Sequence, residues 1–123
     1  MTYQADLDLA LELADIADAI SLARFRALDL HVESKPDRSP VTDADKSVEQ
    51  AIKKILANQA PEDALIGEEY GNTGSASRTW IIDPIDGTAN YLRGVPVWAT
   101  LIALAIDVKP TVSVFSATAL GRR

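Results

Sequence analysis

Cysteine is absent from the 123 residues of this chain. Disulfides, thiolate metal sites and cysteine nucleophiles are therefore excluded. Histidine is nearly absent too, because His31 is the only one. We expect no catalytic Ser-His-Asp set around this histidine, since a lone histidine is most simply structural.

Basic side chains are in the minority: 12 Lys and Arg face 18 Asp and Glu, for a formal charge of -6. Domains that bind nucleic acid normally carry a basic surface, so we expect no nucleic-acid partner. An acidic excess suits a site that collects cations, although its ordinary role is solubility.

Long apolar runs are also missing. The longest, residues 95–106, is too short to span a bilayer. The first twenty residues mix acids among apolar side chains, unlike a signal peptide. We therefore expect a cytoplasmic protein with no membrane partner, and one domain of ordinary globular composition.

Hydrophobic periodicity predicts two long helices. Residues 5–28 carry Leu9, Leu13, Ile16 and Ile20 at helical spacing. A second helix is expected over residues 43–58, begun by Thr42 or Asp43. Its inner face is predicted to carry Val48, Ile52, Ile55 and Leu56.

Several short apolar runs predict strands between and after these helices, with a short helix at residues 88–92. The runs are residues 30–34, 64–67, 79–83, 95–106 and 111–117. Residues 71–78, "GNTGSASR", predict a loop, and Pro84 is expected to end a strand ladder because proline cannot donate to it. The fold class is therefore mixed helix and sheet, α+β.

Acidic residues stand where the apolar runs end. Glu68 and Glu69 close "ALIG", Asp83 closes "WII", and Asp86 follows three residues later. Strands that end on one side of a sheet would bring these carboxylates into one pocket, where they repel unless a cation holds them. Mg²⁺ takes oxygen ligands of this kind. Because Pro84 restricts the turn, the Ile85 carbonyl is expected to face the same volume.

Gly87-Thr88 adds a candidate anion site, because a glycine before a helix start exposes backbone N–H groups. Metal and phosphate sites this close together indicate metal-assisted transfer of a phosphoryl group to water. Taken singly, the same residues read as an aspartate-glycine turn, a solvated strand end and an acidic helix start. Their joint occurrence at element boundaries favours the site.

The stretches "PVTDADKSVE", "LIGEEYG" and "WIIDPIDGTANYLRGVP" together resemble the inositol monophosphatase family of Mg²⁺-dependent phosphomonoesterases. The resemblance runs from the first helix to the last residue. It implies a layered helix/sheet sandwich of which residues 1–123 are the N-terminal, metal- and phosphate-binding portion, with the C-terminal part absent. Within the family, "ALDLHVESKPDRSPVTDAD" and "GTANYLRGVPVWATLIAL" look most like bacterial histidinol-phosphatases.

The resemblance assigns roles residue by residue. Glu68, Asp83 and the Ile85 carbonyl match ligands of a first Mg²⁺, and Asp83 with Asp86 would hold a second. Thr88 and Asp45 match the pair that orients the attacking water near Glu68. The last two assignments are a phosphate site at Asp86, Gly87 and Thr88 and a loop contact from Lys35, which reads equally well as a solvated lysine.

The implied substrate is a small phosphorylated metabolite, L-histidinol phosphate first, with inositol monophosphate or a sugar bisphosphate as alternatives. Relatives are longer and supply a further metal-binding aspartate from their second half, which nothing after Asp107 replaces. We therefore expect weak or no phosphatase activity from these residues alone. Two rivals are a non-catalytic Mg²⁺- or phosphate-binding module and a degenerate fold whose acids bind nothing. Open strand edges make a homodimer a further expectation.

Overall fold

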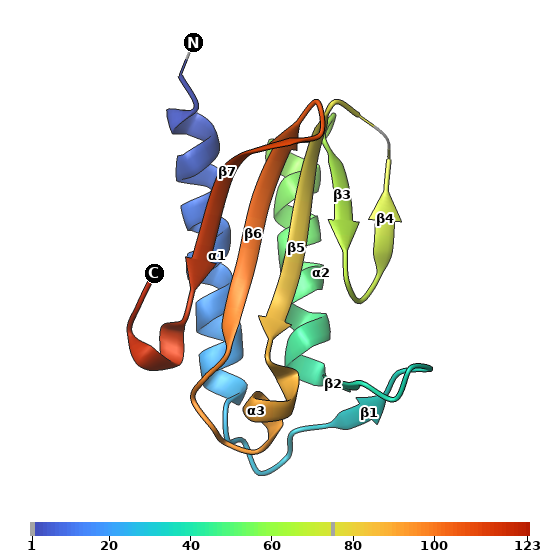
Figure 1. The fold of residues 1–123 in the computed structure, drawn as a ribbon, viewed down its shortest axis with the longest axis vertical. Coiled ribbons are helices and arrows are strands. Elements are labelled where there is room, and N and C mark those ends of the chain that lie inside the picture. Colours follow the sequence, from blue (N-terminus) through green and yellow to red (C-terminus); the bar gives the residue numbers. More distant parts are fainter. Residues whose placement is uncertain (1, 75) are drawn as a thin grey trace.

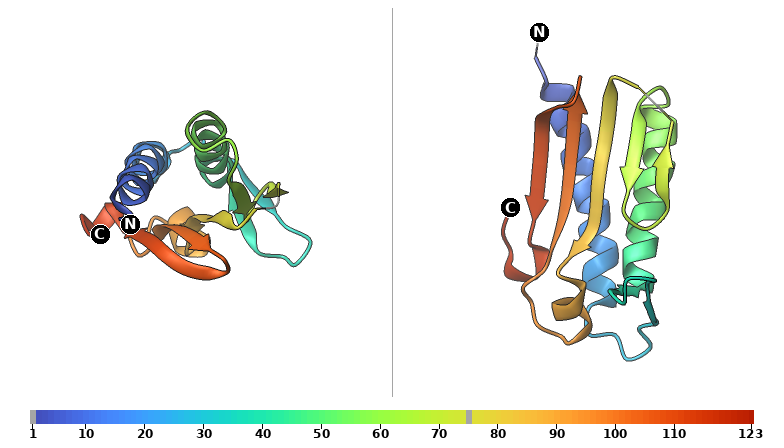
Figure 2. Two further views of the ribbon diagram at one scale, coloured as in Figure 1. Left: turned by 90° about the horizontal axis from the view of Figure 1, so that it is seen from above. Right: turned by 45° about the vertical axis from the view of Figure 1, so that its right-hand side comes forward.

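Two long helices pack against one face of a sheet in the computed structural model, which describes residues 2–74 and 76–123 (Figures 1 and 2). The helices are α1 (Gln4–Arg24) and α2 (Asp43–Gln59). The sheet has the strand order β4-β3-β5-β6-β7, with β3 parallel to β5 and every other pair antiparallel. Its strands are β3 (Ala64–Gly67), β4 (Gly71–Thr73), β5 (Arg78–Asp86), β6 (Ala99–Ile106) and β7 (Lys109–Ser116).

Short elements close the lower end of the molecule in Figure 1. A hairpin of β1 (Val32–Ser34) and β2 (Pro40–Thr42) precedes α2, and α3 (Thr88–Leu92) follows β5. A 3₁₀ turn, Thr118–Leu120, follows β7. The sequence predicted the order of helices and strands but missed β2, which begins at Pro40, and β4, which lies in the predicted 71–78 loop.

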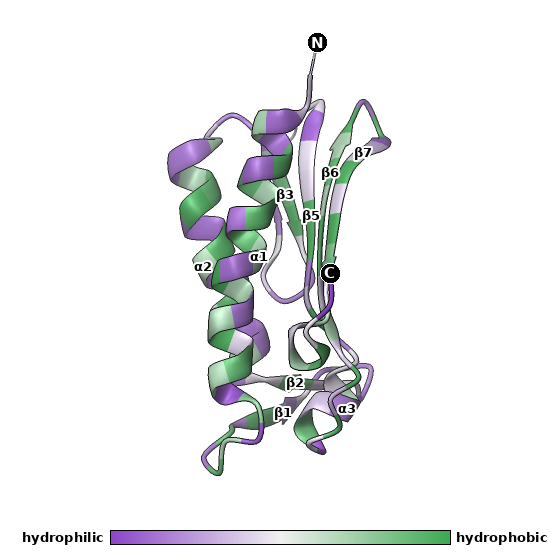
Figure 3. Ribbon diagram, turned by 90° about the vertical axis from the view of Figure 1, so that its left-hand side faces the viewer, coloured by the Kyte–Doolittle hydropathy of each residue, from purple (hydrophilic) through white to green (hydrophobic). Residues whose placement is uncertain are grey.

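The core lies between the helices and the sheet, where apolar side chains of both layers meet (green in Figure 3). In α2 the predicted face is confirmed for Val48, Ile52 and Leu56, which are buried, while Ile55 is partly buried at its margin. In α1 the prediction was wrong in detail, because the buried stripe is made mainly of alanine, with Leu13 and Ser21, while Leu9, Ile16 and Ile20 lie at its margins. Small side chains there let the helix approach its neighbours closely.

Helix α1 ends at Arg24, four residues before the predicted end. Phe25 adopts an extended conformation and its ring lies 5.4 Å from the rings of Tyr91 and Trp98, measured between centroids. The Arg24 guanidinium donates to Asp29 and Asp43, each at 2.8 Å. The packing of Phe25 and the ion pair with Asp43, both made with residues remote in sequence, therefore stop the helix where its own periodicity does not.

The prediction that Pro84 ends the strand ladder was wrong, because β5 runs through Pro84 to Asp86 and its ladder with β6 is only interrupted at the proline. Asp83 pairs with Leu101, and pairing resumes only at Asp86 opposite Ala99. The Thr100 hydroxyl donates to the Pro84 carbonyl at 2.8 Å, which satisfies that carbonyl at the irregularity. The bulge redirects the chain into α3.

The second face of the sheet is not covered by any element among residues 2–74 and 76–123 (Figure 2). Its side chains include the partly exposed Ile66, Ile81 and Phe115. Among the helices that the structure describes, none combines the length and hydrophobicity that a membrane crossing requires.

Candidate active site

The carboxyl ends of β3 and β5 bring Glu68 and Asp83 together. The two strands are parallel, and Gly67 is the register partner of Ile82. The residues that follow, Glu68 and Asp83, therefore lie side by side at the end of β3, although fifteen positions separate them in the chain. This is the convergence that the acidic strand ends predicted.

Asp83 is a partly buried carboxyl in an unfavourable environment for charge. Burial raises its pKa to about 8, and Glu68, Asp86 and Asp45 add to the rise, Glu68 by sharing a proton as well as by repulsion. Asp83 Oδ1 is buried and finds no hydrogen-bond donor among the described residues. A buried carboxylate oxygen without a partner is costly, and a cation would satisfy it.

Asp86 and Gly87 form the corner between β5 and α3. Asp86 is exposed, and Gly87 has a φ of 91°, in the left-handed region that favours glycine. A Cβ at Gly87 would stand 3.1 Å from the Val97 carbonyl oxygen, so space as well as torsion selects glycine. The first N–H groups of α3 have no acceptor within a helix.

Thr88 joins this corner to the start of α2. Its hydroxyl lies 3.0 Å from Asp45 Oδ1 and 3.0 Å from the Ile85 carbonyl oxygen, and it can donate to one of them at a time. Asp45 Oδ2 accepts from the backbone N–H of Thr42 at 2.8 Å and from its hydroxyl at 2.6 Å. Thr42 in turn caps α2, so one capping box both begins the helix and orients Asp45.

Burial raises the pKa of Asp45, and its hydrogen bonds from Thr42 and Thr88 offset part of that rise. The side chain is almost completely buried, and its free lone pairs are few. Asp45 is therefore a proton acceptor with a fixed orientation beside a hydroxyl.

Lys35 reaches the site from the β1–β2 hairpin. Its ammonium lies 3.0 Å from Glu69 Oε1 and 3.4 Å from Glu68 Oε1. Burial alone would lower the pKa of Lys35, but the two carboxylates outweigh it and the pKa is raised. The structure thus brings the predicted loop lysine to the acids, with Glu69 as its nearer partner.

A second anchor holds α3 from the helix layer. The Tyr91 ring is fully buried against Trp98, at 4.9 Å between centroids, and its hydroxyl donates to the Ser21 carbonyl of α1 at 2.7 Å. Trp98 precedes β6 rather than lying within a strand. The corner that carries Gly87 and Thr88 is therefore tied to both layers.

Across residues 2–74 and 76–123, no three His, Cys, Asp or Glu side chains gather closely enough to form a metal-binding group. Glu68 and Asp83 still approach each other, and Glu68 also lies 3.4 Å from the Lys35 ammonium. The donor set is nevertheless oxygen-only, and the buried Asp83 Oδ1 lacks a partner. These residues fit a hard divalent cation such as Mg²⁺.

Sequence reasoning missed one buried acid beside the site. Glu49 accepts the backbone N–H groups of Glu69 and Tyr70, and its side chain is almost fully buried. A signal was present, because Glu49 follows Asp45 by one helical turn on the face that carries Val48 and Ile52. An acid on an apolar stripe marks a buried polar contact.

Comparison with known proteins shows which family the chain resembles over nearly its whole length. The family model described as "Inositol monophosphatase family" matches residues 3–123. Histidinol-phosphatase of Streptomyces coelicolor is 56% identical over an alignment of 126 residues, which covers 98% of this chain and 47% of that protein. Histidinol-phosphatase of Mycobacterium tuberculosis is 56% identical over 119 residues, covering 96% of this chain and 46% of that protein.

The fold is shared with solved structures of the same group. An inositol monophosphatase from Zymomonas mobilis matches with a TM-score of 0.79 at 39% identity, over 99% of this chain and 46% of that one. The chain spans about half the length of the relatives it matches. On these matches, the chain belongs to the inositol monophosphatase family.

Proposed function

We propose that residues 1–123 carry the metal- and phosphate-binding part of a Mg²⁺-dependent phosphomonoesterase that hydrolyses L-histidinol phosphate to L-histidinol and phosphate. The observation that carries the proposal is the hydrogen bond between Thr88 and Asp45 beside the paired Glu68 and Asp83. A positioned proton acceptor next to paired carboxylates is the arrangement that hydrolysis of a phosphate ester requires.

The proposed ligands follow from this geometry. Glu68, Asp83 and the Ile85 carbonyl would hold one Mg²⁺, and Asp83 with Asp86 a second. Bound Mg²⁺ would neutralise the charge of the phosphate and acidify water in the site. Metal binding would also relieve the repulsion that raises the pKa of Asp83.

The chain's own residues move the proton. The Thr88 hydroxyl accepts a hydrogen bond from the attacking water while it donates to Asp45. As the water oxygen bonds to phosphorus, its proton passes to Asp45 by way of Thr88. The ester P–O bond breaks, the leaving alcohol takes up a proton from solvent water, and Asp45 releases to solvent the proton that it received. Backbone N–H groups of Gly87 and Thr88, with Asp86 beside them, would orient the phosphate.

Histidinol phosphate is the preferred ester because two relatives at 56% identity are histidinol-phosphatases. Inositol monophosphate and a sugar bisphosphate are the alternatives. The proposed contacts bind the phosphate group, which the three esters share, and do not distinguish between their alcohols.

The test joins this chain to the remaining half of the Streptomyces coelicolor enzyme and measures phosphate release with Mg²⁺ or EDTA. We expect Mg²⁺-dependent turnover, fastest with histidinol phosphate among the three esters. Asp83→Asn should abolish it, whereas Asp107→Asn, the same change at an exposed turn, should not. Turnover that survives EDTA or Asp83→Asn contradicts the proposal.

A second candidate is a module that binds Mg²⁺ or phosphate without turnover. It is favoured by the finding that no three acids of the described residues gather into a metal-binding group, which a two-ion catalytic site would need. This candidate predicts Mg²⁺ binding by the 123-residue chain and no phosphate release by the joined protein.

A further inference from the structure

Glu49 is a buried acid that the proposed mechanism does not use. It lies in α2 and is 1% exposed. A carboxylate at that depth needs hydrogen-bond donors, since an unpaired one would be strongly destabilising. Its surroundings therefore indicate what it does.

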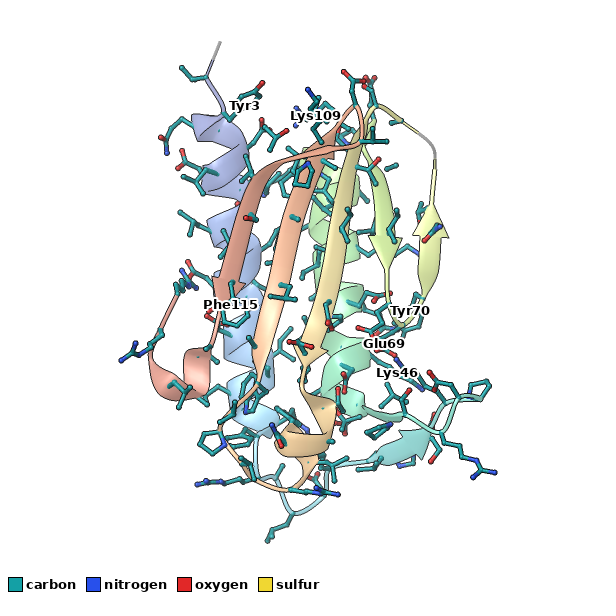
Figure 4. The ribbon with its side chains drawn as sticks, viewed as in Figure 1. Tyr3, Lys46, Glu69, Tyr70, Lys109 and Phe115 are labelled. Atoms are coloured by element: carbon teal, nitrogen blue, oxygen red, sulfur yellow. The ribbon has the colours of Figure 1, made fainter. Side chains whose placement is uncertain are left out.

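Both carboxylate oxygens of Glu49 accept backbone N–H groups from one turn. The Glu69 N–H donates to Oε1 at 2.7 Å, and the Tyr70 N–H donates to Oε2 at 2.5 Å. Two successive N–H groups that converge on one anion form a nest around it. Figure 4 shows Glu69 and Tyr70 on this turn beside α2. The turn begins with Glu68, the proposed metal ligand.

Glu49 also occupies the space beside Gly67, the residue before Glu68. A Cβ on Gly67 would stand 2.9 Å from Glu49 Oε1 and closer still to Cδ and Oε2. The carboxylate can lie this close to Gly67 only because glycine has no side chain. Glu49 therefore packs against the backbone immediately before Glu68 and accepts hydrogen bonds from the backbone immediately after it.

The Glu68 side chain is held less firmly than Glu49. It is 47% exposed, its ion pair with Lys35 is long, at 3.4 Å, and its other partner is the Asp83 carboxyl with which it would share Mg²⁺. The backbone on which Glu68 stands therefore decides whether its side chain reaches Asp83. That backbone rests on the same helical face that presents Asp45 to Thr88.

We propose that Glu49 is a positioning residue that holds the Glu68 turn so that Glu68 and Asp83 can share Mg²⁺. One buried face of α2 thereby sets two parts of the site, the water-orienting pair through Asp45 and the metal ligand through Glu49. The inference rests on the proposed function, because only there is Glu68 a metal ligand.

Calorimetric titration of the metal-free 123-residue chain with Mg²⁺ tests it without any need for turnover. Glu49→Gln keeps the shape but sets an amide donor against a backbone donor, and it should weaken Mg²⁺ binding about 10- to 100-fold. Glu62→Gln removes the same charge from an exposed position and should leave the affinity within about twofold.

A buried control separates positioning from stability. Ile52→Val removes a methyl group one turn further along the same face of α2 and should lower Tm without changing the Mg²⁺ affinity. The inference is overturned if Glu49→Gln binds Mg²⁺ like the wild type, or if Ile52→Val loses as much affinity at an equal loss of Tm.

A measurement on the wild-type chain decides the matter even if Glu49→Gln does not fold. Scalar coupling across the two hydrogen bonds, from the Glu69 and Tyr70 amide nitrogens to Glu49 Cδ, should be present with and without Mg²⁺. The Glu68 carboxyl resonance should shift on titration. Missing couplings overturn the role of Glu49 alone. A Glu68 resonance that does not shift when Mg²⁺ binds removes Glu68 from the proposed ligands, and the role of Glu49 with it. A wild-type chain that does not bind Mg²⁺ at all overturns the proposed function, and this role with it.

Discussion

Thr88 Oγ1 lies 3.0 Å from Asp45 Oδ1, although the two residues are 43 positions apart. One belongs to the first turn of α3 and the other to the first turn of α2. Each helix start is fixed independently, Asp45 by its capping box and Thr88 by the Gly87 corner. The hydroxyl and the carboxyl therefore meet without either side chain having to reorganise, as proton transfer in a water-attack mechanism needs.

Removal of the Thr88 hydroxyl should slow catalysis without loss of the metal. In the protein joined to the second half of its Streptomyces relative, Thr88→Ala should lower kcat about 10²- to 10⁴-fold, because the path from water to Asp45 is broken. Calorimetry should show Mg²⁺ affinity close to that of the unaltered protein. Thr111→Ala, which removes a hydroxyl that donates to the nearby Lys109 carbonyl, is the matched control. Equal rates for Thr88→Ala and the control would refute the assigned role.

The metal-free chain should lose stability as the pH rises, through Asp83. Its pKa in the folded state, about 8, lies above the ordinary value of 3.8. The folded state therefore holds a proton that the unfolded state releases, and this contribution is complete below about pH 4 and lost as the pH rises through about 8. In EDTA, the Asp83→Asn variant should lack this part of the pH dependence. At about pH 9 its Tm should therefore be higher than that of the wild type. A wild-type Tm that exceeds that of Asp83→Asn there would contradict the assignment.

Mg²⁺ binding should release protons near neutral pH. Ligand carboxylates must be ionised, and Asp83 is largely protonated below a pKa of about 8 in the metal-free chain. Calorimetry at about pH 7 in buffers of different ionisation enthalpy should show release of about one proton per chain, falling toward zero above about pH 9. Affinity should rise over the same interval. Binding enthalpies that do not depend on the buffer would show that Asp83 is not a ligand.

Lys35 should compete with Mg²⁺ for the acids. Its ammonium neutralises part of the charge on Glu69 and Glu68. Lys35→Met should therefore tighten Mg²⁺ binding by up to about fivefold at low salt, an effect that fades as ionic strength rises. Lys53→Met, a change at an exposed lysine farther along α2, serves as the control. Weaker binding by Lys35→Met would instead mark the lysine as a support for the ligand geometry.

Short-range patterns explain the successes and the failures of the sequence predictions. Apolar spacing predicted α2 and the strand runs. Pro84 was expected to end the β5 ladder, but the strand resumes its pairing at Asp86 after a bulge. The same reasoning carried α1 past Arg24, because nothing local records the packing of Phe25 on Tyr91 and Trp98. It also left Glu49 unnoticed, because its donors come from a turn some twenty residues away.

The amino-acid sequence by itself determined the chemistry on offer: carboxylates at strand ends, a glycine at the α3 corner, a capped α2 and motifs shared with a phosphatase family. Local torsional preference and side-chain type suffice for these. Only the tertiary structure decided which of these groups meet. The parallel register of β3 and β5 places Glu68 beside Asp83. Helix α2 places Asp45 next to Thr88 and Glu49 next to the turn that follows Glu68. Such pairings depend on long-range packing that no short stretch of chain encodes.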